Sequence, residues 1–443
     1  HILRHPDFWE MSTWIGQEHE RVQEVAVSTE IGSTPALCWF EEQHFSDPGM
    51  YGQTVFLHLK QHVTRQEVEQ ALTDLVARHE MLRAHLDPAG RLVVGAPRPV
   101  RVETASLPVA ARFDLSRDLF IKAFLEGNRL QLSLHHWAVD GLSMRILLED
   151  FARALTGVRS HKPARFPQKT ASFQTYAQLL ADKAAGLTPG GWGEGGREPH
   201  VILSQTSSAE FEMDAQRTDR IFKSAQRAYA LNTQELLLSA LAQTASQLAE
   251  QRPVVIMVEG HGRDAVEGLD VSRTVGWFTT QYPVEFPAVH GMQECLIAHK
   301  ECYRKVAQRG ADYGLARYLR RLPVRRDAWI RFNYLGEIRL ADPSLFSLES
   351  VPLCGDCSAQ NTMPCLLDVT AAIQENRLLL RVCMAPQLAG GAQKFGQQML
   401  DLLEQVGEHC LHKTAMRTPS DFPLVSLTQD QLQTILEDTE DVI

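Results

Sequence analysis

Leucine occupies every second position of the segment 129–135 (RLQLSLH), and polar residues lie between the leucines. This alternation is typical of a β-strand with one apolar and one polar face. The apolar segment 119–125 precedes it, and Glu126-Gly127-Asn128 between the two favours a tight turn. The pattern predicts a β-hairpin. If His135 ends the polar face, His136 falls on the apolar, interior side.

Other segments have the three-and-four spacing of amphipathic helices. Thr64 can cap a helix, and Glu67 completes a capping box ahead of an apolar face. Segments 142–151 and 233–248 are also helical in pattern, and the second is followed by the apolar strand 254–258. Strands that alternate with helices predict an α/β fold.

Residues 186–196 contain six glycines, a density that cannot sustain the interior of a helix or strand. We expect this linker to divide the chain into two halves. The second half should contain a hairpin at 368–384 that turns near Glu375-Asn376. Residues 1–24 are helical in pattern, and the acidic end of the chain (from 437) is expected to run into another domain.

The composition is that of a globular protein, with 44% hydrophobic and 22% charged residues. A formal net charge of -10 argues against nonspecific nucleic-acid binding, and no apolar run approaches the roughly 20 residues that span a bilayer. There is neither an initiator Met nor a signal peptide, so we expect a cytoplasmic piece of a longer polypeptide. The cysteines are scattered. The pair Cys354 and Cys357 has no second pair to complete a zinc site, so we expect no bound metal.

The strand end at His135-His136 leads into Asp140-Gly141 and then into a helical pattern. Neighbouring side chains on a strand point to opposite faces, so only one histidine can line a given cleft. A histidine with a nearby carboxylate can serve as a general acid or base, and Gly141 permits a tight path. Two core or surface histidines beside an ordinary turn are an equally open interpretation.

Glu259 ends the apolar strand and precedes Gly260-His261-Gly262-Arg263. Burial should raise the pKa of its carboxyl toward the range useful for a base, and the glycines allow a substrate close to the backbone. A structural glutamate, paired for example with Arg263, is the alternative.

Asn333 and Tyr334 carry polar groups within an apolar segment and could donate hydrogen bonds to a developing oxyanion. A strand that only packs its aromatic rings fits the pattern as well. A basic run could meet an acidic partner or a phosphate, or could be a solvated face. It comprises Arg317, Arg320, Arg321, Arg325 and Arg326.

The motif H-H-x-x-x-D-G at 135–141 resembles the signature of the condensation-domain superfamily of nonribosomal peptide synthetases. The segment 79–84 (HEMLRA) resembles an upstream motif of the same superfamily. From this resemblance Arg83 is expected to pair with Asp140 as a structural bridge.

Further segments resemble the epimerisation branch of that superfamily and appear in the expected order over roughly residues 30–430. They are 35–41, 258–264, 273–279 with 282–284, and 332–336. Two departures put the local site shape in doubt: Met144 stands where the branch usually has Trp, and 310–314 is a degraded glycine-rich motif. Residues 1–14 resemble the last helix of a carrier domain.

The resemblance implies an α/β, chloramphenicol-acetyltransferase-like fold, a two-lobed V-shaped pseudo-dimer with the active site in the channel between lobes. The implied divisions are 1–24 (tail of an upstream carrier domain), 25–185 and 186–430 (the two lobes) and 431–443 (linker).

The implied reaction is epimerisation at the Cα of an aminoacyl or peptidyl thioester. The substrate is held on the phosphopantetheine arm of an upstream carrier domain, with neighbouring synthetase modules as further partners and no cofactor bound by this chain. Glu259 is expected to act as base and His136 as proton donor, or the reverse. Tyr334 and Asn333 would assist them.

Supporting roles are implied for His135, Asp140, Gly141 and Arg83, and carrier or arm contacts are expected at Arg317, Arg320 and Arg321. Two rivals stay open: a condensation domain, which would not need the segments around Glu259 and Asn333, and a docking module without catalysis.

Overall fold

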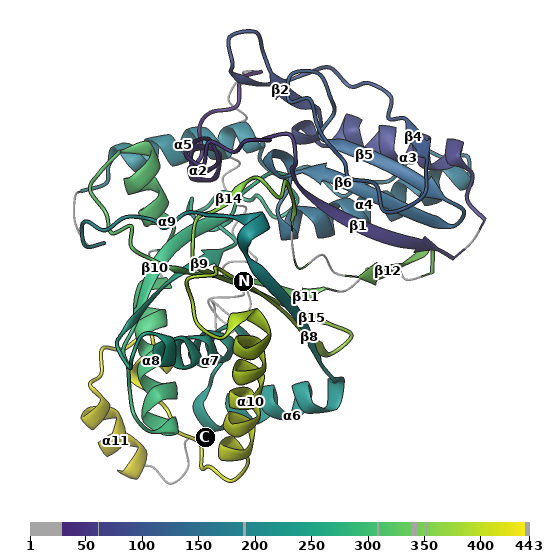
Figure 1. Ribbon diagram of the computed structural model, residues 1–443. Helices are drawn as coiled ribbons and strands as arrows, with labels where there is room; N and C mark the ends of the chain where they lie inside the picture. Colours follow the sequence, from purple (N-terminus) through teal and green to yellow (C-terminus); the bar gives the residue numbers. More distant parts are fainter. Residues whose placement is uncertain are drawn as a thin grey trace.

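Two β-sheets, each with helices on one face, form the two lobes of the computed structural model (Figure 1). The structure describes residues 29–60, 62–188, 192–307, 310–338, 344–350, 353 and 355–438. The predictions for residues 1–24, for Cys354 and for the acidic end at 439–443 lie outside these residues. In the described part of the chain, no helix is both long and apolar enough to cross a membrane.

The N-terminal lobe is built on a mostly antiparallel sheet, and its elements follow the predicted patterns. Its strand order is β12 (Phe346–Ser350), β1 (Tyr51–Leu59), β6 (Arg129–His135), β5 (Ile121–Glu126) and β4 (Val102–Thr104). Helix α3 (Arg65–Arg78) begins with the predicted capping box, in which Thr64 Oγ1 accepts from Glu67 N at 3.2 Å and Thr64 N donates to Glu67 at 2.7 Å. Helix α4 (Gly141–Arg159) packs beside α3 and is longer than the pattern predicts.

The C-terminal lobe has a sheet with the order β10 (Thr280–Phe286), β9 (Val254–Gly260), β11 (Ile330–Ile338), β15 (Leu367–Gln374), β16 (Arg377–Met384) and β8 (Ser207–Met213). Strand β11 runs parallel to both β9 and β15. The predicted hairpin at 368–384 is confirmed, with Glu375 and Asn376 at its turn in left-handed conformations.

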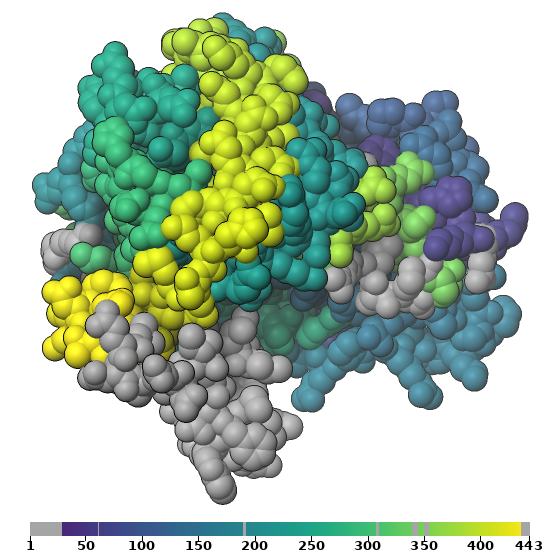
Figure 2. Space-filling model, turned by 90° about the horizontal axis from the view of Figure 1, so that it is seen from below, coloured from purple at the N-terminus to yellow at the C-terminus, as the bar shows by residue number. Residues whose placement is uncertain are grey.

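Helices cover one face of this second sheet and leave the other face toward the first lobe. They are α6 (Ala215–Tyr229), α7 (Thr233–Leu248), α8 (Met292–Ala307) and α10 (Gly391–Leu411). Figure 2 shows the C-terminal part of the chain, coloured yellow-green to yellow, on this side of the lobe. The side chains of Ile256, Val258 and Phe332 face the helices and are fully buried. Alternation along each strand therefore turns Glu259 and Asn333 to the opposite face, toward the space between the lobes.

Segments of the second half of the chain join the N-terminal lobe, so the division near residue 186 is not complete. Strand β12 and the short β13 (Asp356–Cys357) come from the second half of the chain but pair with β1 in the N-terminal lobe (Figure 1). The loop that carries Val275, Trp277 and Phe278 also belongs to the N-terminal core. These crossings hold the two sheets together and form part of the walls of the space between them.

Candidate active site

Two adjoining cavities lie between the lobes, and each has the size of a pocket for a drug-sized ligand. The arginine chamber, about 330 Å³, contains Arg331 and Arg381 in its wall. The glycine chamber, about 360 Å³, is lined by Gly141, Gly260, Gly262 and Gly310 among others. Five residues line both chambers and therefore mark their junction: Gln53, His136, Glu259, Asn333 and Leu335.

His136 lies at this junction because β6 ends at His135 and a 3₁₀ turn (His136–Ala138) begins immediately afterwards. Its Nε2 is 3.3 Å from Gln53 Nε2, and its ring is 4.3 Å from Trp277 and 5.3 Å from Tyr51, centroid to centroid. Among the described residues, no group bonds its buried Nδ1. Burial lowers the pKa of His136 to about 4, so its imidazole is neutral at physiological pH.

His135 has a different environment, fully buried in the N-terminal lobe. Its Nδ1 accepts from Trp137 N at 3.3 Å, so Nε2 carries the proton and donates to Pro48 O at 3.0 Å. The polar face of β6 that His135 completes is itself buried. Gln131 bonds both backbone groups of Val109, and this covering segment explains why a polar strand face meets no solvent.

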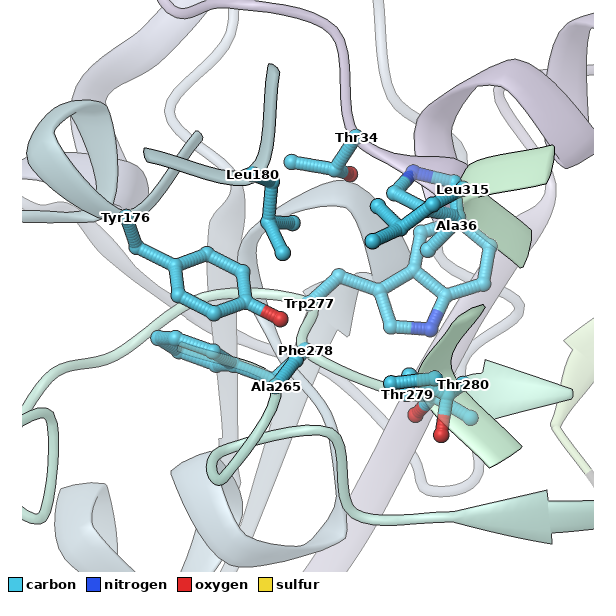
Figure 3. A pocket seen from close by; sticks show the side chains of 12 residues that line it. Thr34, Ala36, Tyr176, Leu180, Ala265, Trp277, Phe278, Thr279, Thr280 and Leu315 are labelled. Carbon is cyan, nitrogen blue, oxygen red and sulfur yellow. The ribbon is translucent and has the colours of Figure 1, made fainter. Parts of the chain in front are cut away.

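Trp277 is held between the lobes by tight packing. Behind it lies a cavity of only about 10 Å³, close to the space of a single water, which Trp277 lines together with Leu315 and Thr280 (Figure 3). At the edge of the same cavity the Tyr176 hydroxyl donates to Gly262 O at 2.9 Å. The indole that contacts His136 therefore has little room to move.

Asp140 caps α4 and ties the histidine turn to a loop that comes from the second half of the chain. Its carboxylate accepts from Ser143 N at 2.8 Å, from Phe278 N at 3.0 Å and from Arg263 Nη2 at 3.4 Å. The Arg263 guanidinium also lies over the Phe278 ring, 4.0 Å from its centroid. The carboxylate thus joins three backbone segments.

The expected bridge between Arg83 and Asp140 is wrong. Arg83 donates to Gly95 O and Val76 O, both at 2.8 Å, because the last turn of α3 leaves carbonyls that need donors. Gly141 also differs from its expected role. Its backbone is not in the left-handed region, and a Cβ there would meet no protein atom, so this glycine leaves space in the glycine chamber rather than permitting a tight path.

Glu259 reaches the junction from the end of β9. Gln281 Nε2 donates to its Oε1 at 3.2 Å, and the alternative partner Arg263 is instead bonded to Asp140. Burial raises the pKa of the Glu259 carboxyl, and the positive charge of Arg331 opposes that shift in part.

Asn333 and Tyr334 lie on β11. The Asn333 side chain lines both chambers, and Tyr334 lines the glycine chamber, where burial raises the pKa of its hydroxyl. Tyr334 therefore remains a hydrogen-bond donor at neutral pH.

The basic run is divided: Arg320, Arg321 and Arg326 are exposed, whereas Arg317 is buried and is not placed to contact a carrier. Its side chain is 4% exposed and pairs with Glu198 at 2.8 Å. Arg320 donates to the carbonyls of Ala184 and Ala185, and the exposed Arg321 pairs with Glu42. These arginines hold chain segments together.

Sequence reasoning missed several groups around the junction. Gln53, Gln281 and Trp277 contact the two central side chains, and Arg331 forms a two-bond pair with Asp368 in the arginine chamber (2.6 and 3.2 Å). Arg331 could have been found, since strand alternation puts it on the same face as Asn333, two residues away. No cluster of three or more metal-ligating side chains is present among the described residues.

Comparisons with known proteins assign the family. The Condensation domain family model matches residues 28–188 and 196–423, so the chain belongs to the condensation-domain family. Surfactin synthase subunit 1 of Bacillus subtilis is 30% identical over 98% of this chain, and the chondramide synthase of Chondromyces crocatus is 30% identical over 93%. The chain spans 14% and 12% of these relatives' lengths.

Solved structures share the fold. The epimerization domain from the third module of tyrocidine synthetase B superposes with a TM-score of 0.76 at 24% identity, over 88% of this chain and 99% of that one. The X-domain from teicoplanin biosynthesis gives 0.64 at 18% identity, over 87% and 96%. The predicted two-lobed, chloramphenicol-acetyltransferase-like α/β fold is confirmed.

Proposed function

We propose that this chain inverts the Cα stereocentre of an aminoacyl or peptidyl thioester carried on the phosphopantetheine arm of a carrier domain. The observation that carries the proposal is the junction of the two chambers, where His136 from one lobe and Glu259 from the other line both cavities. Inversion needs a proton to leave one face of the carbon and to return on the other. Two proton-transfer groups on opposite lobes meet that need.

The protonation states of His136 and Glu259 favour one direction of proton transfer in the first step. His136 is neutral because its pKa is lowered to about 4, so it can accept the α-proton. Burial favours the protonated form of Glu259 more than exposure to water would, so Glu259 can supply a proton to the other face. This assignment is the reverse of the first one considered from the sequence. The return reaction uses the same groups with exchanged protonation states.

The carbonyl of the thioester acidifies the α-proton, and negative charge develops on its oxygen as the proton leaves. Asn333 lines the junction and Tyr334 lines the glycine chamber, and we assign the hydrogen bond to that oxygen to the Asn333 amide or the Tyr334 hydroxyl. The rings of Trp277 and Tyr51 keep His136 in a largely apolar setting.

Two chambers that meet at the reacting carbon suit a substrate with two ends. An extended arm would occupy one chamber and the acyl group the other, with no cofactor held by this chain. The relatives are synthases, or parts of synthases, many times longer than the chain, which supports an upstream carrier domain and neighbouring modules as partners.

The test uses a carrier domain loaded with an L-aminoacyl or L-peptidyl thioester in D2O. We expect deuterium at Cα together with formation of the D-epimer. A second carrier with a free aminoacyl group is added in parallel. Peptide-bond formation without inversion would make the chain a condensation domain, and carrier binding without either reaction would make it a docking module.

A further inference from the structure

Polar side chains form a row across the face of the C-terminal sheet that is turned toward the space between the lobes. Strand register aligns Gln281 with Glu259, Asn333 with Thr370, and Thr370 with Arg381. Partners across neighbouring strands project from the same face. Glu259, Asn333, Thr370 and Arg381 all line the arginine chamber, so the row leads from the proposed site of proton transfer into that chamber.

Arg331 and Arg381 line this chamber together with Asp368 and Glu259, and among the described residues only Arg331 is hydrogen-bonded to a carboxylate. Arg331 and Asp368 neutralise each other through two hydrogen bonds. Arg381 is 19% exposed, and its nearest carboxylate is that of Glu210, 3.8 Å away on a side chain that is 68% exposed. That distance is too long for a hydrogen bond. Arg381 therefore presents a mostly buried guanidinium with unused donors to the chamber.

We propose that the arginine chamber holds the part of a peptidyl substrate upstream of the inverted residue, and that Arg381 binds a carboxylate on that part. The inference rests on the proposed epimerisation, and it selects a peptidyl over an aminoacyl substrate. An aminoacyl group held at the junction is too short to reach Arg381, whereas a peptidyl group can extend to it. A planar guanidinium binds a carboxylate through two parallel hydrogen bonds.

The geometry of the sheet sets the position of the carboxylate. Three strand spacings separate β9 from β16, which is about 14 Å at roughly 4.8 Å per spacing. An extended peptide covers this distance in about four residues. The arginine and acidic side chains bridge part of it, so the acidic residue lies about two or three positions upstream of the inverted one.

The test measures binding separately from catalysis. Peptidyl-aminopantetheine amides, which cannot lose their acyl group, carry Glu or Gln at one of the four positions upstream of the terminal residue. Their affinities for the whole chain are measured by calorimetry. We expect the Glu ligand to bind about tenfold more tightly than the Gln ligand at position two or three. The Arg381→Gln variant should lose this preference and Arg381→Lys should keep much of it.

Arg377→Gln is the matched control, because Arg377 lies on the same strand and pairs with Glu212 but is 51% exposed outside the chamber. It should leave the preference unchanged. Equal binding of Glu and Gln ligands at all positions, or an unchanged preference in Arg381→Gln, would overturn the inference. Deuterium exchange without a preference for the Glu ligand would contradict only the proposed subsite. A preference for the Glu ligand without any deuterium exchange would contradict the proposed reaction and leave the subsite in place.

Discussion

Arg263, from the second half of the chain, donates to the Asp140 carboxylate of the first half, and the exposed fractions of the two side chains are only 10% and 6%. Breaking a buried pair by removing one partner costs about 3–5 kcal/mol. We expect Asp140→Asn and Arg263→Gln each to lower the free energy of unfolding, with a coupling of about 1–3 kcal/mol in the double variant. Urea unfolding measures all three values.

Arg83 provides the negative control for the double-mutant cycle of Arg263 and Asp140. Since Arg83 bonds Gly95 O and a carbonyl at the end of α3, Arg83→Gln and Asp140→Asn should be additive within about 0.5 kcal/mol. Coupling between Arg83 and Asp140, or its absence between Arg263 and Asp140, would contradict the assignment of the bridge.

Gly262 and Gly336 separate a steric effect from a backbone effect. Both have positive φ, +65° and +79°, which costs a residue with a side chain about 1–2 kcal/mol. A Cβ on Gly262 would also lie 1.8 Å from Phe278 O, whereas one on Gly336 would meet nothing. Gly262→Ala should therefore destabilise the protein well beyond Gly336→Ala in urea unfolding; equal losses would be inconsistent with this packing.

His135 should make stability depend on pH. Burial lowers its pKa in the folded protein to about 4, whereas the unfolded chain binds the proton near pH 6.5. The contribution of the neutral His135 side chain to the free energy of unfolding is complete above pH 6.5. About 3 kcal/mol of it is lost as the pH falls toward 4. His135→Gln should give a shallower decline in unfolding free energy over this range, and an unchanged slope would count against a buried neutral His135.

Arg317 and Arg321 contrast a buried with an exposed arginine of the same segment. Arg317→Gln leaves the buried Glu198 with only the more distant Arg326 at 4.0 Å and should cost about 3–5 kcal/mol. Arg321 is 63% exposed, so Arg321→Gln should change the unfolding free energy by at most about 1 kcal/mol. Similar costs for the two variants in urea unfolding would refute this distinction.

Local patterns predicted the elements well because their causes are local. The capping box at Thr64 and the turn at Glu375-Asn376 depend on residues within one turn of chain. The alternation along 129–135 predicted the strand, but not that the segment around Val109 buries its polar face.

The sequence predicted the central residues of the candidate site, but not the residues that hold them in place. Glu259 could be recognised from the apolar strand that it ends. The partner of Asp140 depends on how the loop with Arg263 crosses between lobes, and no spacing in the sequence reports such a long-range contact. The basic run was uninformative for the same reason, since Glu198 and Glu42, which pair with Arg317, lie far away in the chain.

The central claim is that His136 and Glu259 act on opposite faces of one carbon. The most direct measurement follows deuterium uptake and chirality separately for L- and D-peptidyl carriers in D2O, with Glu259→Gln, His136→Gln and the exposed control Glu212→Gln. With His136 as the only remaining base, Glu259→Gln should still exchange the α-proton of the L-substrate but form no D-epimer, and it should leave the D-substrate unlabelled. His136→Gln should show the mirror pattern. Inversion at the wild-type rate in Glu259→Gln would contradict the two-sided site.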